Sequence, residues 1–182
     1  AATSADARPW SLDLVGPVAP PDRAWLEARL LEPDCGRITS HDRLPPDRAW
    51  ALAADADVGL CLLQDTPAFR DAMPSKVYEY QACGLPTLAT PLPRVAALIR
   101  GTGAGAVVAD HGETVAELRR FAADAAHREA LVSAARAAGE ASRARPNVYD
   151  DAAALIAELV ASAATVGERR NLDQTAVMAR QK

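Results

Sequence analysis

The chain has 182 residues, of which 49% are hydrophobic and 4% aromatic, with 20 lysines and arginines against 24 aspartates and glutamates. This composition is typical of a folded, soluble domain and excludes disordered and collagen-like chains. The formal net charge of −4 argues against nucleic acid as a main partner, because contact with a phosphate backbone needs a broad basic face.

Signals for short strands and helices alternate along the chain. Short β-prone runs predict strands at 11–15, 37–41, 58–63, 86–89 and 106–109. Apolar residues at helical spacing predict helices at 22–31, 47–54, 74–83, 94–99, 113–122, 124–138 and 149–163. This alternation favours an α/β fold with a doubly wound, Rossmann-like, mostly parallel sheet and helices on both faces. Residues 1–166 are predicted to form this domain, and residues 167–182 a polar tail.

The segment from Phe69 to Thr90 carries the chemistry. It follows an apolar run typical of a buried strand, and open α/β sheets bind ligands at the carboxyl ends of their strands. Pro74 suits the first position of a helix, which leaves the amides of Ser75 and Lys76 as a seat for a phosphate or carboxylate. The positive charge of Lys76 is unfavourable there, because it lies at the positive end of the helix dipole. A bound diphosphate would make this charge favourable, since its negative charges would attract both. The alternative is a solvated lysine paired with Glu79.

Two acidic residues accompany this helix start. Glu79 lies one turn from Ser75 and Lys76, where a carboxylate can accept two hydrogen bonds from a vicinal diol such as that of a ribose. Asp71 lies in the preceding loop, within reach of whatever the helix holds, and a turn-forming role is its alternative.

The cysteines and histidines show no spacing typical of metal ligands, so no metal site and no disulfide framework are predicted. They are Cys35, Cys61, Cys83, His41, His111 and His127. The reducing cytoplasm is the expected compartment, since no signal peptide and no run of the ~18 apolar residues that a membrane helix needs is found.

The run Pro74-Ser-Lys-Val-Tyr-Glu-Tyr-Gln-Ala-Cys-Gly-Leu-Pro86 resembles the donor-site segment of GT-B glycosyltransferases, specifically the retaining family-4 type and its bacterial envelope-polysaccharide relatives. The resemblance covers roughly Trp10 to Asp110. It implies that the chain is similar to the C-terminal, nucleotide-sugar-binding domain of such an enzyme.

The resemblance also implies roles for individual residues. Glu79 would correspond to the second acid of the family's E-x7-E motif and hold the ribose hydroxyls. Asp71 falls where the first acid belongs, near the donor sugar. Ser75 and Lys76 would face the diphosphate, so that Asp71 and Lys76 are the candidate catalytic residues.

Two further positions would lie near the nucleotide base. They are Gly16 and Leu44, each at or just beyond the end of a predicted strand. Position 42, often glycine in the family, is Asp42 here.

The resemblance begins at what corresponds to the second strand of the donor domain. The first strand, the family's basic Arg/Lys pair and the N-terminal acceptor domain are therefore expected to be missing, and the sheet to carry a gap or changed pairing. Because charge stabilisation is usually the largest catalytic effect, this polypeptide alone is expected to be inactive.

The function implied is transfer, with retention, of a hexosyl group from a UDP- or GDP-linked sugar to an envelope glycan or lipid-linked acceptor, without a metal or other cofactor. The expected partners are the nucleotide sugar and an acceptor domain, and peripheral association with the inner membrane face stays open. The alternative is a non-catalytic module, derived from this domain, that binds a nucleotide or a partner. An NAD-type Rossmann domain is the poorest interpretation, because no G-x-G-x-x-G follows a strand.

Overall fold

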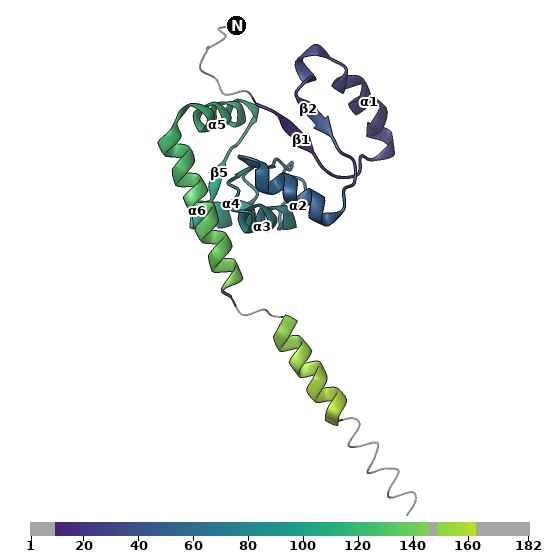
Figure 1. Cartoon of the computed structure of the whole chain (residues 1–182), viewed down its shortest axis with the longest axis vertical. Coiled ribbons are helices and arrows are strands. Elements are labelled where there is room, and N and C mark those ends of the chain that lie inside the picture. Colours follow the sequence, from purple (N-terminus) through teal and green to yellow (C-terminus); the bar gives the residue numbers. More distant parts are fainter. Residues whose placement is uncertain (1–9, 146–148, 163–182) are drawn as a thin grey trace, which may run out of the picture. The chain divides into compact units, whose positions relative to one another are not determined.

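Residues 10–145 and 149–162 are described in this computed structural model, and the chain divides into two compact units, Ala1–Ser142 and Arg143–Lys182. In the first unit short strands alternate with helices (Figure 1). In chain order they are β1 (Leu12–Leu14), α1 (Pro20–Leu30), the 3-10 helix η1 (Pro33–Cys35), β2 (Ile38–Ser40), α2 (Pro46–Asp55), β3 (Gly59–Cys61), α3 (Ser75–Ala82), β4 (Thr87–Ala89), α4 (Pro93–Thr102), β5 (Gly105–Val107), α5 (His111–Ala123) and α6 (Ala125–Arg143). This order confirms the predicted α/β fold.

The described strands form two parallel sheets. In one, β1 pairs with β2, and in the other the order is β3-β4-β5. Leu60 of β3 lies opposite Leu88 of β4, which lies opposite Ala106 of β5. In the described residues no pairing joins β1 to β3. The parallel sheet arrangement was predicted, and the break between β1 and β3 agrees with the expected gap.

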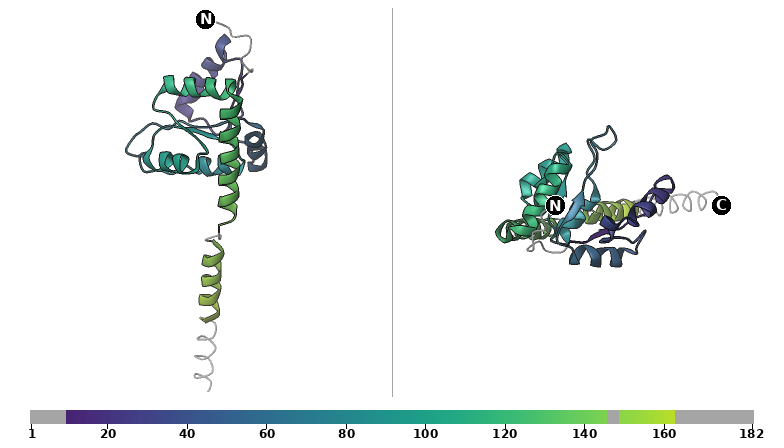
Figure 2. Two further views of the ribbon diagram at one scale, coloured as in Figure 1. Left: turned by 90° about the vertical axis from the view of Figure 1, so that its left-hand side faces the viewer. Right: turned by 90° about the horizontal axis from the view of Figure 1, so that it is seen from above.

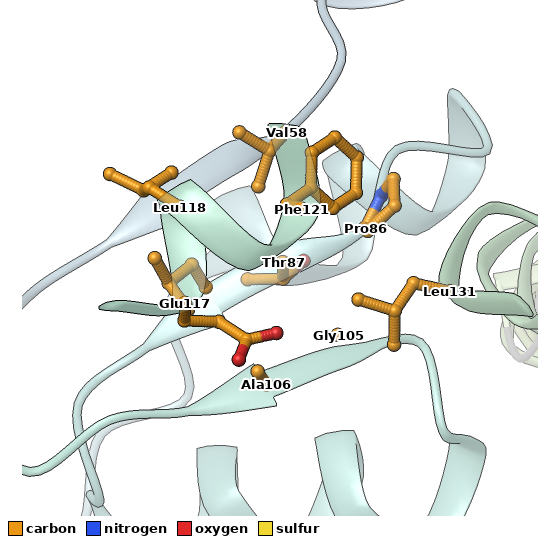
Figure 3. A pocket seen from close by; sticks show the side chains of 10 residues that line it. Val58, Pro86, Thr87, Gly105, Ala106, Glu117, Leu118, Phe121 and Leu131 are labelled. Carbon is orange, nitrogen blue, oxygen red and sulfur yellow. The ribbon is translucent and has the colours of Figure 1, made fainter. Parts of the chain in front are cut away.

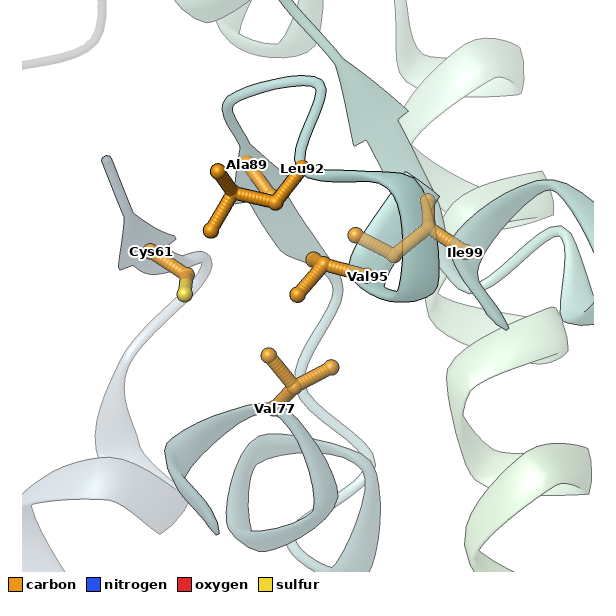
Figure 4. Close-up of a cluster of buried hydrophobic side chains, with 6 residues drawn as sticks. All are labelled: Cys61, Val77, Ala89, Leu92, Val95 and Ile99. Carbon is orange, nitrogen blue, oxygen red and sulfur yellow. The ribbon is translucent and has the colours of Figure 1, made fainter. Parts of the chain in front are cut away.

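The hydrophobic core belongs to the three-stranded sheet. Its buried side chains come from β3, β4, α3 and α4 and from the turn before α4 (Figure 4). They are Cys61, Val77, Ala89, Leu92, Val95 and Ile99. Helices α3 and α4 lie on one side of this sheet and α5 on the other (Figures 1 and 2). The core therefore fixes where α3 and α4 begin, at the carboxyl ends of β3 and β4.

The elements around the two-stranded sheet have no comparable core. Helices α1 and α2 contain no buried residue. The side chains of Trp25 and Trp50 are 67% and 42% exposed. Since a helix of this length derives most of its stability from packing an apolar face, α1 and α2 gain little stability from buried side chains.

Two helices extend further than predicted, and glycine explains both differences. The prediction ended the helix before Gly101, but α4 continues to Thr102 and stops at Gly103, whose φ of 68° is left-handed. The prediction ended the next long helix before Gly139, but α6 runs through it to Arg143. Gly139 is needed inside α6 because a Cβ there would overlap the backbone carbonyl of Gln81.

In the second unit residues 149–162 form a helix, in agreement with the prediction for 149–163. Its apolar side chains Leu155, Ile156, Leu159 and Val160 are all more than half exposed. The predicted tail at 167–182 lies outside the described residues. Among the described helices, none combines the length and the apolar character that crossing a bilayer requires.

Candidate functional site

The N-terminus of α3 is open and carries no side-chain cap. Pro74 is the N-cap residue, with φ −62° and ψ 130°, and not the first helical residue as predicted, because its extended ψ places it just before the helix. Its carbonyl accepts the N–H of Val77 at 3.2 Å. In the described structure the N–H groups of Ser75 and Lys76 have no acceptor. Two donors and the positive end of the helix dipole are therefore available to an anion.

Lys76 adds a cation to these donors. The residue is half-buried and forms no ion pair within the described part of the chain, so the alternative pairing with Glu79 is not formed. Burial raises the pKa of the Cys61 thiol, and the nearby Lys76 ammonium opposes this rise. Cys61 is the last residue of β3, so the ammonium lies near the carboxyl end of that strand.

The two candidate acids are both exposed. Glu79 lies on α3, one turn beyond Ser75 and Lys76. Burial is the largest cause of the raised pKa of the Tyr80 hydroxyl, the nearby Cys61 is the second and the charge of Glu79 is the third. Asp71 lies in the loop before α3. Its backbone carbonyl, and not its carboxylate, accepts a hydrogen bond, from Arg94 at 3.3 Å.

Arg94 is a candidate that the sequence interpretation missed. It is the second residue of α4, whose N-cap Leu92 makes no side-chain cap bond and whose first turn contains no acid. In contrast, α1 and α2 carry Asp22 and Asp47 in their first turns. Proline followed closely by a cation occurs at the start of all four of these helices, but only α3 and α4 lack an acid in the first turn. This absence was the signal that could have identified Arg94.

Gly16 and Leu44 belong to the two-stranded sheet. Gly16 follows β1 with φ 140°, and its N–H donates to the carbonyl of Asp42 at 2.8 Å. Asp42 has φ 52°, a left-handed conformation that glycine adopts freely and that aspartate tolerates better than most residues. Its carboxylate accepts hydrogen bonds from Arg23 at 3.3 Å and from the Arg43 amide at 3.0 Å. Among the described residues no hydrogen bond or ion pair joins this corner to α3.

Two of the histidines have acidic partners. Nε2 of His41 lies 2.7 Å from a carboxylate oxygen of Asp13 on β1. Nε2 of His127 lies 2.6 Å from Glu117 of α5. The partners are 28 and 10 residues away in sequence, so only the fold brings them together.

A cavity of about 10 Å³ lies among residues of β4, β5, α5 and α6, with Glu117 and Leu131 on its wall (Figure 3). Its volume is about that of one water molecule. None of the candidate site residues lines it. It is therefore too small to be a nucleotide site.

Comparison with known proteins identifies the family. The family model described as glycosyl transferase-like matches residues 2–171. No curated protein matches the chain at a significant level.

The fold is similar to that of solved glycosyltransferases. WaaG, a glycosyltransferase involved in lipopolysaccharide biosynthesis, matches with 24% identity and a TM-score of 0.56 over 71% of this chain and 34% of WaaG. Sucrose-phosphate synthase from Thermosynechococcus elongatus matches with 22% identity and a TM-score of 0.58 over 72% of this chain and 34% of its own. The chain thus spans about a third of the length of these structures. With the family model matched over most of its residues, this chain belongs to the glycosyl transferase-like family and has the Rossmann-like fold of GT-B glycosyltransferases.

Proposed function

We propose that the chain is the donor-binding half of a retaining, family-4 type glycosyltransferase, which transfers a hexosyl group from a UDP- or GDP-linked sugar to an envelope glycan or lipid-linked acceptor. The observation that carries the proposal is the start of α3, where two backbone amides and the half-buried Lys76 have no partner among the described residues. A diphosphate presents several acceptor oxygens and two or more negative charges, which match these donors.

The neighbouring residues fit the rest of the donor. Glu79, one turn along α3, is exposed and is free to accept hydrogen bonds from a ribose diol. Arg94, at the start of α4, brings a second cation to the same edge of the sheet. Asp71 is exposed in the loop between β3 and α3, where the sugar would lie if the diphosphate bound the helix tip.

In this proposal Lys76 and the α3 amides stabilise the negative charge that develops on the departing nucleoside diphosphate. Electrostatic stabilisation of this kind is usually the largest catalytic contribution. Arg94 can supply part of the positive charge of the family's basic pair, but it hydrogen-bonds a backbone carbonyl in this structure. We therefore expect the 182-residue chain to bind the donor without turning it over, and an acceptor domain to complete the enzyme.

Titration of the chain with UDP and GDP by isothermal calorimetry tests the proposal. Lys76→Gln is expected to weaken UDP binding by about 10- to 100-fold, because a charge-assisted hydrogen bond contributes about 1.5–3 kcal/mol. Arg100→Gln is the matched control: it removes a cation from the last turn of α4, at the opposite end from Arg94, and is expected to leave UDP binding unchanged. Equal losses in the two variants would show that overall charge, and not the helix tip, attracts the nucleotide.

The alternative, a non-catalytic nucleotide-binding module, predicts the same titration but no turnover in any context. Hydrolysis or transfer from a UDP-sugar by the chain, when an acceptor domain of the same enzyme is supplied, separates the two.

A further inference from the structure

The β3–α3 loop (residues 64–72) is held together by its own hydrogen bonds. The N–H groups of Phe69 and Arg70 both donate to the carbonyl of Thr66, at 3.0 and 2.8 Å. The Nε and Nη2 groups of Arg70 donate to the two carboxylate oxygens of Asp65, at 2.9 and 3.2 Å. A bidentate pair of this kind fixes the relative orientation of its two residues. The loop is therefore expected to move as one body.

The two residues that flank the loop are fixed in the domain. Leu63 and Met73 are both partly buried and pack against the hydrophobic core cluster. The carbonyl of Leu63 also accepts a hydrogen bond from the hydroxyl of Thr90, at the end of β4, at 2.5 Å. Because both ends are fixed, the motion that is open to the loop is a rotation about the line through Leu63 and Met73.

A single hydrogen bond connects the middle of the loop to the rest of the chain. The Nη1 group of Arg94 donates to the backbone carbonyl of Asp71 at 3.3 Å. Within residues 10–145 and 149–162, no other hydrogen bond or ion pair joins the loop to another segment. The ring of Phe69 does not anchor the loop either, since it is 43% exposed. The orientation of the loop therefore depends on Arg94.

This hydrogen bond is one that an anion would displace. Its acceptor is neutral, its length exceeds the usual 2.9–3.0 Å, and the Arg94 side chain is exposed. Asp71 lies four residues before Ser75, so the guanidinium lies beside the segment that leads to the α3 N-terminus. A diphosphate bound there would offer Arg94 pairs of charged oxygens, and such charge-assisted bonds are roughly twice as strong as neutral ones.

We infer that Arg94 is the positioning residue of the β3–α3 loop. In the free chain it holds the loop through the Asp71 carbonyl, and when a diphosphate binds at α3 it transfers to the phosphate oxygens and releases the loop. The loop carries the Asp71 carboxylate, so diphosphate binding changes the position of this candidate catalytic group. The hydrogen bond in the free chain is independent of the proposed function, whereas the release rests on it.

Backbone ¹⁵N order parameters of the 182-residue chain without ligand test the first half. Arg94→Ala is expected to lower the order parameters of residues 66–71 from about 0.85, the value of a rigid backbone, to below about 0.6. Arg100→Ala is the matched control, because it removes a cation from the last turn of the same helix, and the loop is expected to stay rigid. A value of about 0.85 at Leu88 in β4 shows that each variant is folded.

Inorganic pyrophosphate is the probe for the release. In the parent chain it is expected to lower the order parameters of residues 66–71 to those of Arg94→Ala, with the same midpoint as the shift of the Lys76 amide. In Arg94→Ala it is expected to bind about 3- to 10-fold more weakly and to leave the loop unchanged, because the bond that it breaks in the parent is already absent.

The two halves fail in different ways. Order parameters in ligand-free Arg94→Ala that equal those of the parent would overturn the role of Arg94. A Lys76 amide that shifts with pyrophosphate while the loop stays rigid would overturn the release and leave the proposed nucleotide site intact. A Lys76 amide that does not respond to pyrophosphate would contradict the proposed site and the release together, and the result for the ligand-free variant would still decide whether Arg94 holds the loop.

Discussion

Lys76 is the residue on which the nucleotide proposal depends most. It stands in the first turn of an uncapped helix, where a cation is unfavourable by about 0.3–1 kcal/mol, and no acid pairs with it in the described structure. A bound polyanion removes that cost. The same pattern, a cation in an uncapped first turn that contains no acid, recurs at Arg94 on the neighbouring helix α4.

Substitution of Glu79 can separate recognition of the nucleoside from recognition of phosphate. Its exposed carboxylate can accept ribose hydroxyls but would repel phosphate oxygens. Glu79→Ala is therefore expected to weaken UDP binding about tenfold while leaving inorganic pyrophosphate binding unchanged or slightly stronger, as measured by calorimetry. Equal losses for both ligands would exclude the ribose role.

Gly105 shows how tightly the three-stranded sheet is packed. Its φ is 151°, and a Cβ there would overlap the backbone of Thr87 on β4. Gly105→Ala is expected to destabilise the chain by about 3 kcal/mol or more, because neither backbone can move freely. Gly101→Ala is the control: no atom lies within 4 Å of the new Cβ, and a gain of about 0.5–1 kcal/mol is expected inside α4. Urea unfolding measures both, and a neutral Gly105→Ala would show that β4 and β5 are further apart than described.

At the scale of the elements, Asp124 links the stability of α6 to pH. Its carboxylate accepts the N–H of His127 at 3.0 Å, and this hydrogen bond, with the nearby charges of His127 and Arg120, holds the pKa of Asp124 below its usual value. A lowered pKa stabilises the folded chain above the unfolded pKa, and this contribution is lost as the pH falls through the folded value.

Asp124→Asn keeps an acceptor at the helix start but cannot titrate. The variant is expected to lose less stability than the parent between about pH 5 and pH 2, as measured by the urea midpoint of the circular dichroism signal. Parallel loss of stability in the two proteins would contradict a contribution from this carboxylate.

Most elements were predictable because their signals are local. Apolar periodicity and the glycine and proline punctuation located every described strand and helix of the first unit except η1. The C-terminal ends of α4 and α6 were predicted too early, before Gly101 and Gly139. A glycine in a helical sequence can end the helix, but it can also lie inside the helix where another backbone packs closely. Only the contact of Gly139 with the backbone of Gln81 decides between these roles.

The site was predictable in its local part and not in its tertiary part. The spacing of Ser75, Lys76 and Glu79 on one helix follows from sequence alone. The contact of Arg94 with the loop at Asp71 joins segments 23 residues apart, so no local rule could give it.

At the scale of the whole molecule, packing is uneven. The buried cluster lies between the three-stranded sheet and helices α3 and α4, whereas α1 and α2 bury no residue completely. The part of the chain that carries the helix tips is thus better packed than the part that carries Gly16 and Leu44. Nucleotide affinity that comes from the diphosphate is expected to survive in this chain better than affinity that comes from the base.

The most direct test of the account is to follow backbone amide resonances during titration with UDP. The account predicts that the amides of Ser75 and Lys76 shift first and furthest, since they donate to the diphosphate, and that Glu79 and Arg94 respond with the same midpoint. A response confined to the α5–α6 corner, or none at α3 when UDP is bound, would contradict it.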